Sequence, residues 1–330
     1  MAVASSPSVT PAPSPFVLDS FSYGKSLVRL LRVVRSTSDP SHHSIIEYTV
    51  QTLLYGSLLD TSYTEGDNSL VVATDSQKNT VQYLAKTLPG QEVLCPERFA
   101  LHIANHFPTK YDHIERCTVD VVAQKWSRIA PSDTTVPHPH SFVRDGEEKR
   151  TVTAVAEKQS PGSPVVATQL TGGLKDLLVL KSSGSAFHSF LKDEFTTLRP
   201  VQDRIFSTAV ECKYTLSVDP SQPLSSLLTS PTALPDYEAI ASSVRNHTLR
   251  VFSTHASASV QATLHLMCTE ILSDPVDAAV VDVEYALPNK HYVPVNLEWA
   301  GLENVREDQA EVFLPQADPS GLIKAKVRRA

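Results

Sequence analysis

The chain has 330 residues, and its 29 Lys and Arg against 36 Asp and Glu give a formal net charge of −7. Nucleic-acid and anionic-membrane partners both require a basic face, so this charge argues against either kind of partner. The length is sufficient for two domains with separate cores, and no run of about 18 apolar residues predicts a membrane span. The four cysteines are far apart, which indicates reduced, buried thiols of an intracellular protein.

The first segment, residues 1–20, is rich in Ser, Pro and Ala and lacks the basic start and apolar core of a signal peptide. We therefore expect a disordered N-terminal tail. Apolar residues then alternate with polar ones through residues 26–35 and 44–54. This alternation predicts a hairpin with one buried face.

Residues 67–88 begin apolar and β-branched and continue with helical spacing. This pattern places Thr74 and Asp75 at a predicted strand-to-helix junction. A second helix is expected from Pro96 to about Phe107, because Pro-Glu opens it and bulky apolar residues recur every fourth position. Two further strands are expected in the first half, at residues 112–129 and 140–157.

The second half repeats this order after a loose segment at 158–173. Strands are predicted at 173–182 and 207–218, helices at 236–253 and 257–272, and the last two strands at 278–299 and 311–327. The economical interpretation is a tandem pair of ββααββ domains, 21–165 and 166–330, in an α+β fold of antiparallel sheets with helices on one face. Because such units leave sheet edges exposed, several subunits are expected to close a barrel.

The segment EYALPNKHYVPVNLEW, residues 284–299, has a strand pattern that we predict to be broken by Pro288 and to resume after His291. Proline removes a donor from the ladder and usually marks the edge or the end of a strand. The residues after it, Asn289 and His291 among them, are therefore expected to leave the sheet and face a ligand.

The sequence contains no glycine-rich dinucleotide or phosphate loop and no nucleophile elbow. Nucleotide-cofactor, phosphoryl-transfer and esterase functions are therefore weakly supported. One metal-like spacing is present, at His138 and His140, because alternate residues of a strand point to one side and two imidazoles could share a zinc ion. A third ligand is not evident, and a pair of histidines making ordinary hydrogen bonds is the more common case.

Seven segments, in order along the chain, together resemble the urate oxidase (uricase) family, and the similarity runs from about Tyr23 to Val327. They are YGK (23–25), VVATDSQKNT (71–80), HPHSFVRDGEEKR (138–150), FLKDEFTTL (190–198), DRIFST (203–208), SASVQAT (257–263) and LPNKHY (287–292). The resemblance implies tandem tunnelling-fold (T-fold) domains, four chains closing a barrel, and oxidation of urate by O₂ and water to 5-hydroxyisourate and hydrogen peroxide, with no cofactor.

The resemblance also implies roles for single residues. Arg204 and Gln261 would grip the flat purine, since a guanidinium offers a planar fork to an anionic edge and an amide both donates and accepts. Phe187 would stack on the purine ring. Leu198 and Val260 would wall the pocket, and the backbone at Val260 and Asp75 would offer N–H donors.

The proton-handling group implied by the resemblance is Lys25, Thr74 and His291. Urate must lose a second proton before it reduces oxygen, and because a threonine hydroxyl is too weak a base, Lys25 would have to accept that proton. His291 would relay it, since an imidazole changes charge near neutral pH. Asn289 and Thr74 would hold O₂ or a water above the purine.

In the resembled family each active site is shared by two chains of a homotetramer, so a shared site is expected here. Peroxisomal localisation is also implied, although the chain ends in Arg328-Arg329-Ala330 rather than Ser-Lys-Leu, and a cytoplasmic location is the alternative. Two other functions stay open: a zinc-dependent T-fold enzyme acting on pterins or purines, and a non-catalytic purine-binding scaffold.

Overall fold

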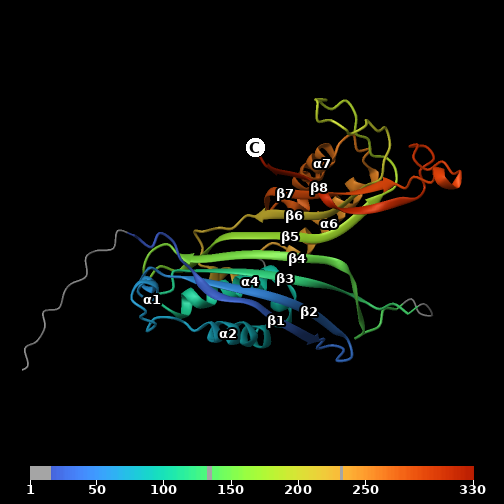
Figure 1. Cartoon of the computed structure of the whole chain (residues 1–330). Helices are drawn as coiled ribbons and strands as arrows, with labels where there is room; N and C mark the ends of the chain where they lie inside the picture. The colour runs from blue at the N-terminus through green and yellow to red at the C-terminus, as the bar shows by residue number, and fades with distance from the viewer. Residues whose placement is uncertain (1–15, 132–135, 231–232) are drawn as a thin grey trace, which may run out of the picture.

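The computed structural model describes residues 16–131, 136–230 and 233–330, and its centre is one antiparallel sheet of eight strands (Figure 1). Each strand pairs with its neighbours in sequence, so the sheet order is simply β1 to β8. The strands are β1 (Tyr23–Arg35), β2 (His43–Tyr55), β3 (Arg116–Arg128), β4 (Phe142–Lys158), β5 (Val165–Lys181), β6 (Phe206–Leu216), β7 (Val280–Pro294) and β8 (Phe313–Arg328).

The described helices lie between the second and third strands of each half, except for one short helix between β7 and β8. The longer ones are α2 (Thr74–Thr87), α4 (Pro96–Lys110), α6 (Tyr237–Thr254) and α7 (Val260–Ser273). Short elements complete each half: η1 (Ser57–Leu59), α1 (Asp60–Thr64), α3 (Gly90–Leu94), α5 (Leu224–Thr229), η2 (Pro275–Asp277) and η3 (Glu298–Ala300). No helix among the described residues is long and apolar enough to cross a membrane.

The core lies between the helices and one face of the sheet, because alternate strand residues are buried. On β6, Val210, Cys212 and Tyr214 are buried, whereas Glu211 and Lys213 between them are exposed. Successive side chains of a strand point to opposite faces, so one face of the sheet is apolar and packs against the helices. The predicted α+β fold with a repeated ββααββ order is confirmed.

Two segments differ from the sequence prediction. Residues 67–73 form a loop rather than a strand, because the backbone N–H of Val72 is donated to the Tyr23 hydroxyl instead of to a neighbouring strand. The apolar character of this loop reflects burial of Val72. The segment 158–173 is not loose throughout, since β5 already begins at Val165 and its first residues are buried.

The predicted tail comprises residues 1–20. Residues 1–15 lie outside the described residues, and residues 16–20 have no regular secondary structure. The predicted domain boundary after residue 165 falls at the start of β5. The sheet is continuous there, because β4 pairs with β5 from Lys149 to Lys158.

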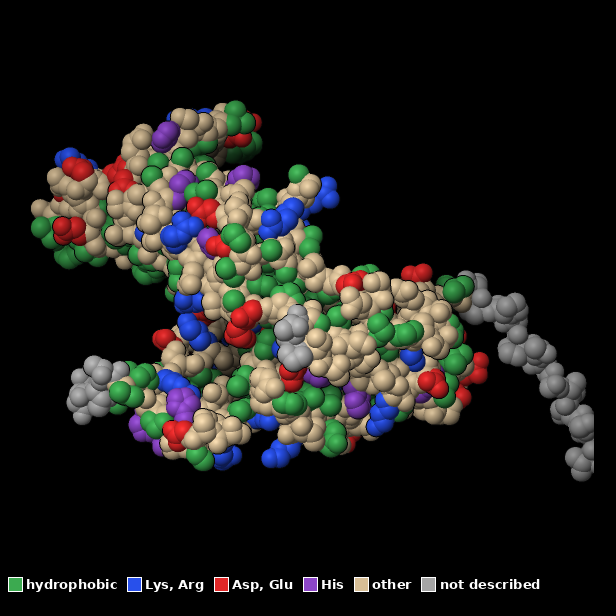
Figure 2. Space-filling model, turned by 180° about the vertical axis from the view of Figure 1, so that it is seen from behind, with side chains coloured by type: hydrophobic (Ala, Val, Ile, Leu, Met, Phe, Trp, Pro, Cys, Tyr) green, Lys and Arg blue, Asp and Glu red, His purple; other side chains and the backbone are tan. Residues whose placement is uncertain are grey.

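Charged side chains gather where the two halves of the molecule meet (Figure 2). The Glu148 carboxylate on β4 accepts hydrogen bonds from Nε of Arg245 on α6 at 2.7 Å and from Nζ of Lys125 on β3 at 2.9 Å. Burial alone would raise the pKa of Glu148, but the hydrogen bonds from these two cations outweigh it and hold that pKa below its usual value. This ion pair therefore joins the two halves.

Replacing Glu148 by Gln is expected to lower the free energy of unfolding by about 1–3 kcal/mol at pH 7, because charge-assisted hydrogen bonds are lost. A depressed pKa means that this contribution is complete above about pH 4.5 and is lost as the pH falls through the folded-state value. Urea unfolding at pH 7 and pH 4, at equal protein concentration, measures the free energy of unfolding of parent and variant. The difference between these two free energies must be smaller at pH 4 than at pH 7.

The control is Glu147→Gln, because Glu147 is the exposed neighbour on the same strand. It is expected to change the free energy of unfolding by less than about 0.5 kcal/mol. An equal loss in both variants, or a difference that widens toward pH 4, would contradict this assignment.

Candidate active site

A first group of predicted site residues is brought together by the connection between β5 and β6. Phe187 pairs with Val201 through two backbone hydrogen bonds, and the backbone N–H of Arg204 is donated to the carbonyl of Ser185 at 2.8 Å. The Arg204 guanidinium lies over the Phe187 ring, 5.2 Å from its centroid. Phe187 in turn stacks on Phe190 at 5.0 Å between ring centroids. A cation and a flat apolar surface therefore stand side by side.

The Arg204 side chain is half-buried and, among the described residues, makes no hydrogen bond or ion pair. Burial lowers its pKa, and no neighbouring carboxylate offsets this effect. A guanidinium taken out of water without a counter-charge is costly, because buried charges in folded proteins are normally paired. The guanidinium is therefore available to pair with an anion that the described part of this chain does not supply.

The start of α7 lies beside the same connection. Ser185 forms an isolated parallel bridge with Ser257, three residues before the helix begins. Val260, the first residue of α7, is buried, while Gln261 is exposed. The structure thus places the predicted clamp partner Gln261 on the helix that adjoins the Arg204 segment.

A cavity of about 510 Å³ opens beside Arg204, and Leu198, Asn289 and His291 contribute to its wall. Asn289 is 9% exposed and His291 is half-buried. Phe187, Val260 and Gln261 do not line this cavity. The wall also includes residues to which the sequence assigned no role, among them Asp203, Lys290, Tyr292 and Glu307.

The predicted break at Pro288 is wrong, because β7 runs without interruption to Pro294. Leu287 and Pro288 are not paired with β6, but both are paired with β8. On the β6 side, the Thr208 hydroxyl donates a hydrogen bond to the Pro288 carbonyl at 2.9 Å. The irregularity lies one step later, as a register shift between Asn289 and His291 against β8. A bulge of this kind re-aims side chains, which explains how residues within a strand reach the cavity.

A second group of predicted residues lies at the other end of the sheet. Lys25 on β1 is paired with Thr52, and a bulge follows at which Leu27 takes a left-handed φ of 57°. Thr74 is the first residue of α2, and Ala73 at the N-cap offers no side-chain acceptor to the first N–H groups. Lys78 is the main cause that lowers the pKa of the Asp75 carboxyl, and the charge of Lys25 adds to it. Lys25 and the start of α2 are therefore neighbours.

The two groups are separated by the sheet itself. β1 and β7 are six inter-strand spacings apart, which at about 4.8 Å each amounts to roughly 29 Å along the sheet. Lys25, Thr74 and Asp75 therefore cannot contact a small molecule bound between Arg204 and His291 of the same chain. We call these two separate groups of predicted site residues the half-sites.

The predicted zinc ligands His138 and His140 lie in the loop between β3 and β4 rather than on a strand. Their rings are 4.5 Å apart in an edge-on arrangement, and the His140 Nδ1 lies 3.3 Å from the carbonyl oxygen of Ser41. In the described part of the chain these histidines belong to no group of three close ligand atoms. The loop position removes the strand geometry on which the zinc interpretation depended.

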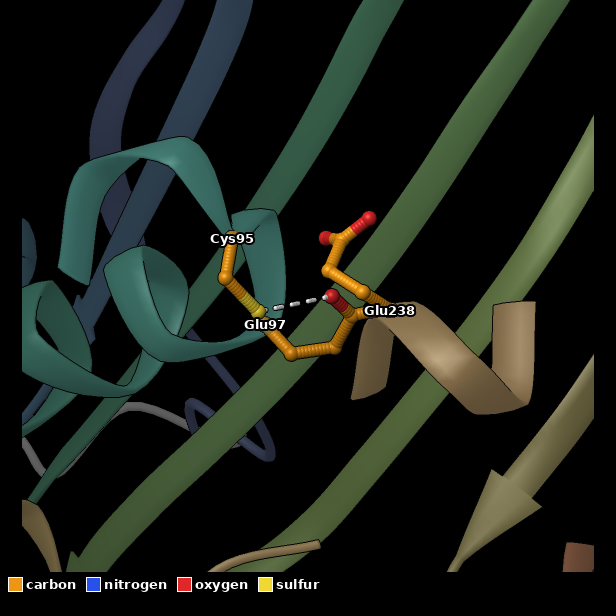
Figure 3. A group of neighbouring side chains, drawn as sticks. All are labelled: Cys95, Glu97 and Glu238. Carbon is orange, nitrogen blue, oxygen red and sulfur yellow. Dashed lines mark hydrogen bonds between the residues drawn. The ribbon is translucent and has the colours of Figure 1, made fainter. Parts of the chain in front are cut away.

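One other cluster has ligand-like spacing, Cys95, Glu97 and Glu238 (Figure 3). Both carboxylates already bind Arg150, at 2.6 Å for Glu97 and 2.7 Å for Glu238. Burial raises the pKa of the Cys95 thiol far above its usual value, so this sulfur is not a thiolate. These residues fit an ion-pair junction between the two halves better than a metal site.

The family model for uricase matches residues 21–155 and 170–324, one segment in each half of the sheet. The chain belongs to the uricase family. It is 40% identical to the uricase of Cyberlindnera jadinii over 314 residues, which cover 94% of this chain and 97% of that protein. It is 41% identical to the uricase of Aspergillus flavus over 309 residues, which cover 93% and 95%.

Membership of the uricase family also agrees with the fold. The crystal structure of the uricase from Arthrobacter globiformis superimposes with a TM-score of 0.78 at 32% identity and covers 96% of each chain. The tandem T-fold prediction is therefore confirmed, since the neighbours share the fold and the two matched segments correspond to its two halves.

Proposed function

We propose that this uricase-family protein oxidises urate with O₂ in sites that two copies of the chain build together. Urate, O₂ and water give 5-hydroxyisourate and hydrogen peroxide, so two electrons pass from the purine to oxygen. The proposed reaction uses no metal and no organic cofactor. The observation that carries the proposal is Arg204, a half-buried cation without a partner in the described chain, which stands over the face of Phe187 beside a cavity.

In the proposed site, the purine anion binds to Arg204 and Gln261 and stacks on Phe187. The charge of the ligand offsets the desolvation of the guanidinium, and an aromatic surface adds about 0.5–1.5 kcal/mol beyond area burial. Leu198 and Val260 exclude water from the edges of the ring. The backbone N–H groups at Val260 and at Asp75 of the second chain supply further donors.

Proton transfer is assigned to Lys25 and Thr74 of one chain and His291 of the other. Lys25 takes the second urate proton through the Thr74 hydroxyl, and His291 relays protons toward the peroxide product. Asn289, nearly buried in the cavity wall, holds O₂ or a water together with Thr74. A shared site is supported by the roughly 29 Å of sheet that separates the half-sites within one chain.

We further propose a homotetramer in which the sheet edges of neighbouring chains pair to close a barrel, because β1 and β8 have no second neighbouring strand among the described residues. A two-fold axis then sets the first half of each chain against the second half of its partner. Peroxisomal localisation stays a prediction from the family resemblance, with the cytoplasm as the alternative.

The activity is tested by incubating the purified protein with urate in metal-free buffer that contains a chelator. Loss of the urate ultraviolet band with formation of one hydrogen peroxide per urate is the expected result. Activity that depends on stoichiometric zinc would instead favour the metal-dependent T-fold enzyme. Urate binding without turnover would favour the non-catalytic scaffold. Zinc-dependent activity and binding without turnover would each refute the proposal.

Replacing Arg204 by Ala is expected mainly to weaken binding, by about 2–5 kcal/mol, because the charged half of the clamp is removed from a desolvated site. Calorimetry with xanthine, a purine that lacks the C8 oxygen of urate, measures the change without turnover. The matched control is Arg199→Ala, an exposed arginine of the same connection, which is expected to bind xanthine as the parent does. Unchanged affinity in Arg204→Ala would rule out the clamp.

Mixing two defective chains tests the shared site. Lys25→Met chains are expected to bind purine but turn over about 10²–10⁴ times more slowly, and Arg204→Ala chains are inactive at urate concentrations below their dissociation constant. When both are unfolded together in equal amounts and refolded, about a quarter of the sites should contain both intact halves under two-fold pairing. Activity near a quarter of that of identically refolded parent chains is expected.

The refolded parent and each variant refolded alone are the controls for this mixture. Activity in the mixture above the sum of the two variants can arise only from sites shared between chains. If the mixture gains nothing while the parent recovers, the half-sites do not meet across chains.

A further inference from the structure

The turn Ser183–Ser185 lies between the two segments that present the proposed purine clamp. On one side, Ser185 accepts the backbone N–H of Arg204 at 2.8 Å. On the other, the Ser257 N–H is donated to the Gly184 carbonyl at 2.9 Å and the Ala186 N–H to the Ser257 carbonyl at 2.8 Å. The position of this turn therefore sets the distance between Arg204 and the segment that leads into α7.

From Ser257 the same connection continues into the helix that carries Gln261. The Ser257 hydroxyl is donated to the Ser259 carbonyl at 3.0 Å and accepts the Thr263 hydroxyl at 2.8 Å. Ser259 caps α7 by accepting the backbone N–H of Ala262 at 3.1 Å. Ser257 and Thr263 are both buried, so these bonds are shielded from water. A shift of the turn would consequently move the start of α7.

One side chain holds the turn in place, the carboxylate of Asp203. Its Oδ1 accepts the backbone N–H groups of Gly184 at 2.7 Å and of Ser185 at 3.3 Å, and its Oδ2 accepts the Ser183 hydroxyl at 2.5 Å. Gly184 has a left-handed φ of 79°, which lets two successive N–H groups point at one oxygen. Burial alone would raise the pKa of Asp203, but these donors outweigh it and hold the pKa below its usual value.

Asp203 does not neutralise the arginine that follows it. The lowered pKa of Arg204 has burial as its cause, with no contribution from the Asp203 charge. The carboxylate bonds to the Ser183–Ser185 turn, whereas the guanidinium lies over the ring of Phe187. The backbone N–H of Asp203 is itself donated to the Glu307 carboxylate, which fixes the residue from a third direction.

We propose that Asp203 is a positioning residue for the purine clamp: by holding the Ser183–Ser185 turn, it sets the separation of Arg204 and Gln261 while leaving the Arg204 charge free for the ligand. This inference rests on the proposed urate site. Asp203 lines the cavity wall, but both of its carboxylate oxygens are occupied by the turn, so its proposed role acts through the position of the clamp. Its loss is therefore felt in binding and not in proton transfer.

Replacing Asp203 by Ala is expected to raise both KM for urate and the dissociation constant for xanthine by about tenfold to a hundredfold, as the loss of hydrogen bonds to a charged group implies. kcat should stay within about threefold of the parent. Asp203→Asn keeps an oxygen for the two N–H groups and an amide that can donate to Ser183, so it should restore KM to within about threefold. A purely structural defect would lower kcat and the melting temperature together.

A double-mutant cycle separates action through Arg204 from an independent effect. In chains that already carry Arg204→Ala, the further change Asp203→Ala should alter the xanthine dissociation constant by less than about twofold. The matched control is Asp219→Ala, because the Asp219 carboxylate caps another turn through Ser221, at 2.9 Å to its N–H and 2.6 Å to its hydroxyl. That variant should bind xanthine as the parent does.

The inference is overturned by additive effects in the cycle, by parent-like KM in Asp203→Ala, or by an Asn variant as defective as Ala. If Asp203→Ala fails to fold, the positioning role is tested with Ser183→Ala instead. A KM for urate raised about threefold supports the positioning role, and an unchanged KM refutes it. A parent protein without urate turnover would refute the proposed function instead. The xanthine cycle would still report on the clamp in that case.

Discussion

The continuous pairing of eight strands is the constraint on which the rest of the molecule depends. Backbone hydrogen bonds hold neighbouring strands about 4.8 Å apart, so the sheet fixes the distance between β1 and β7. Lys25 on β1 and Arg204, which lies just before β6, cannot approach one another by side-chain motion, because the sheet distance between β1 and β6 exceeds the reach of any side chain. The sheet therefore keeps the two half-sites apart within one chain, and the proposed pairing with a second chain is what would bring them together.

The two half-sites are prepared in different ways. In the second half, the cation Arg204 is desolvated in advance and its neighbour Asp203 is occupied with a turn, so the energetic cost of an unpaired charge is met by folding rather than by binding. In the first half, Lys25 stands beside a bulge with a left-handed residue, Leu27, and next to a helix start without a capping side chain. Both are features that regular secondary structure would avoid, and they adjoin Lys25 and Thr74, the residues that the family resemblance associates with chemistry.

Much of the fold could be predicted from the sequence because the alternation of apolar residues is strong on strands with one buried face, as on β6. The errors have local physical causes. Residues 67–73 look like a strand because Val72 must be buried, yet their N–H groups bond to a side chain and a turn. Pro288 looks like a break, but the gap it leaves is confined to the side of β6. Asp203 could not be singled out, since its role depends on a turn twenty residues earlier that only the fold brings to it.

The net negative charge of the molecule bears on how both half-sites would bind an anion. A chain with a net charge of −7 does not attract an anionic purine through its overall field, so the attraction must be local. In the proposed shared site three positive features converge from two chains: the Arg204 guanidinium, the start of α7 at Val260 and the start of α2 at Thr74. Helix N-termini carry unsatisfied N–H groups and partial positive charge, and these act at short range. In the proposed shared site an anion is held only when two chains are paired, so urate binding and assembly would stabilise each other by mass action.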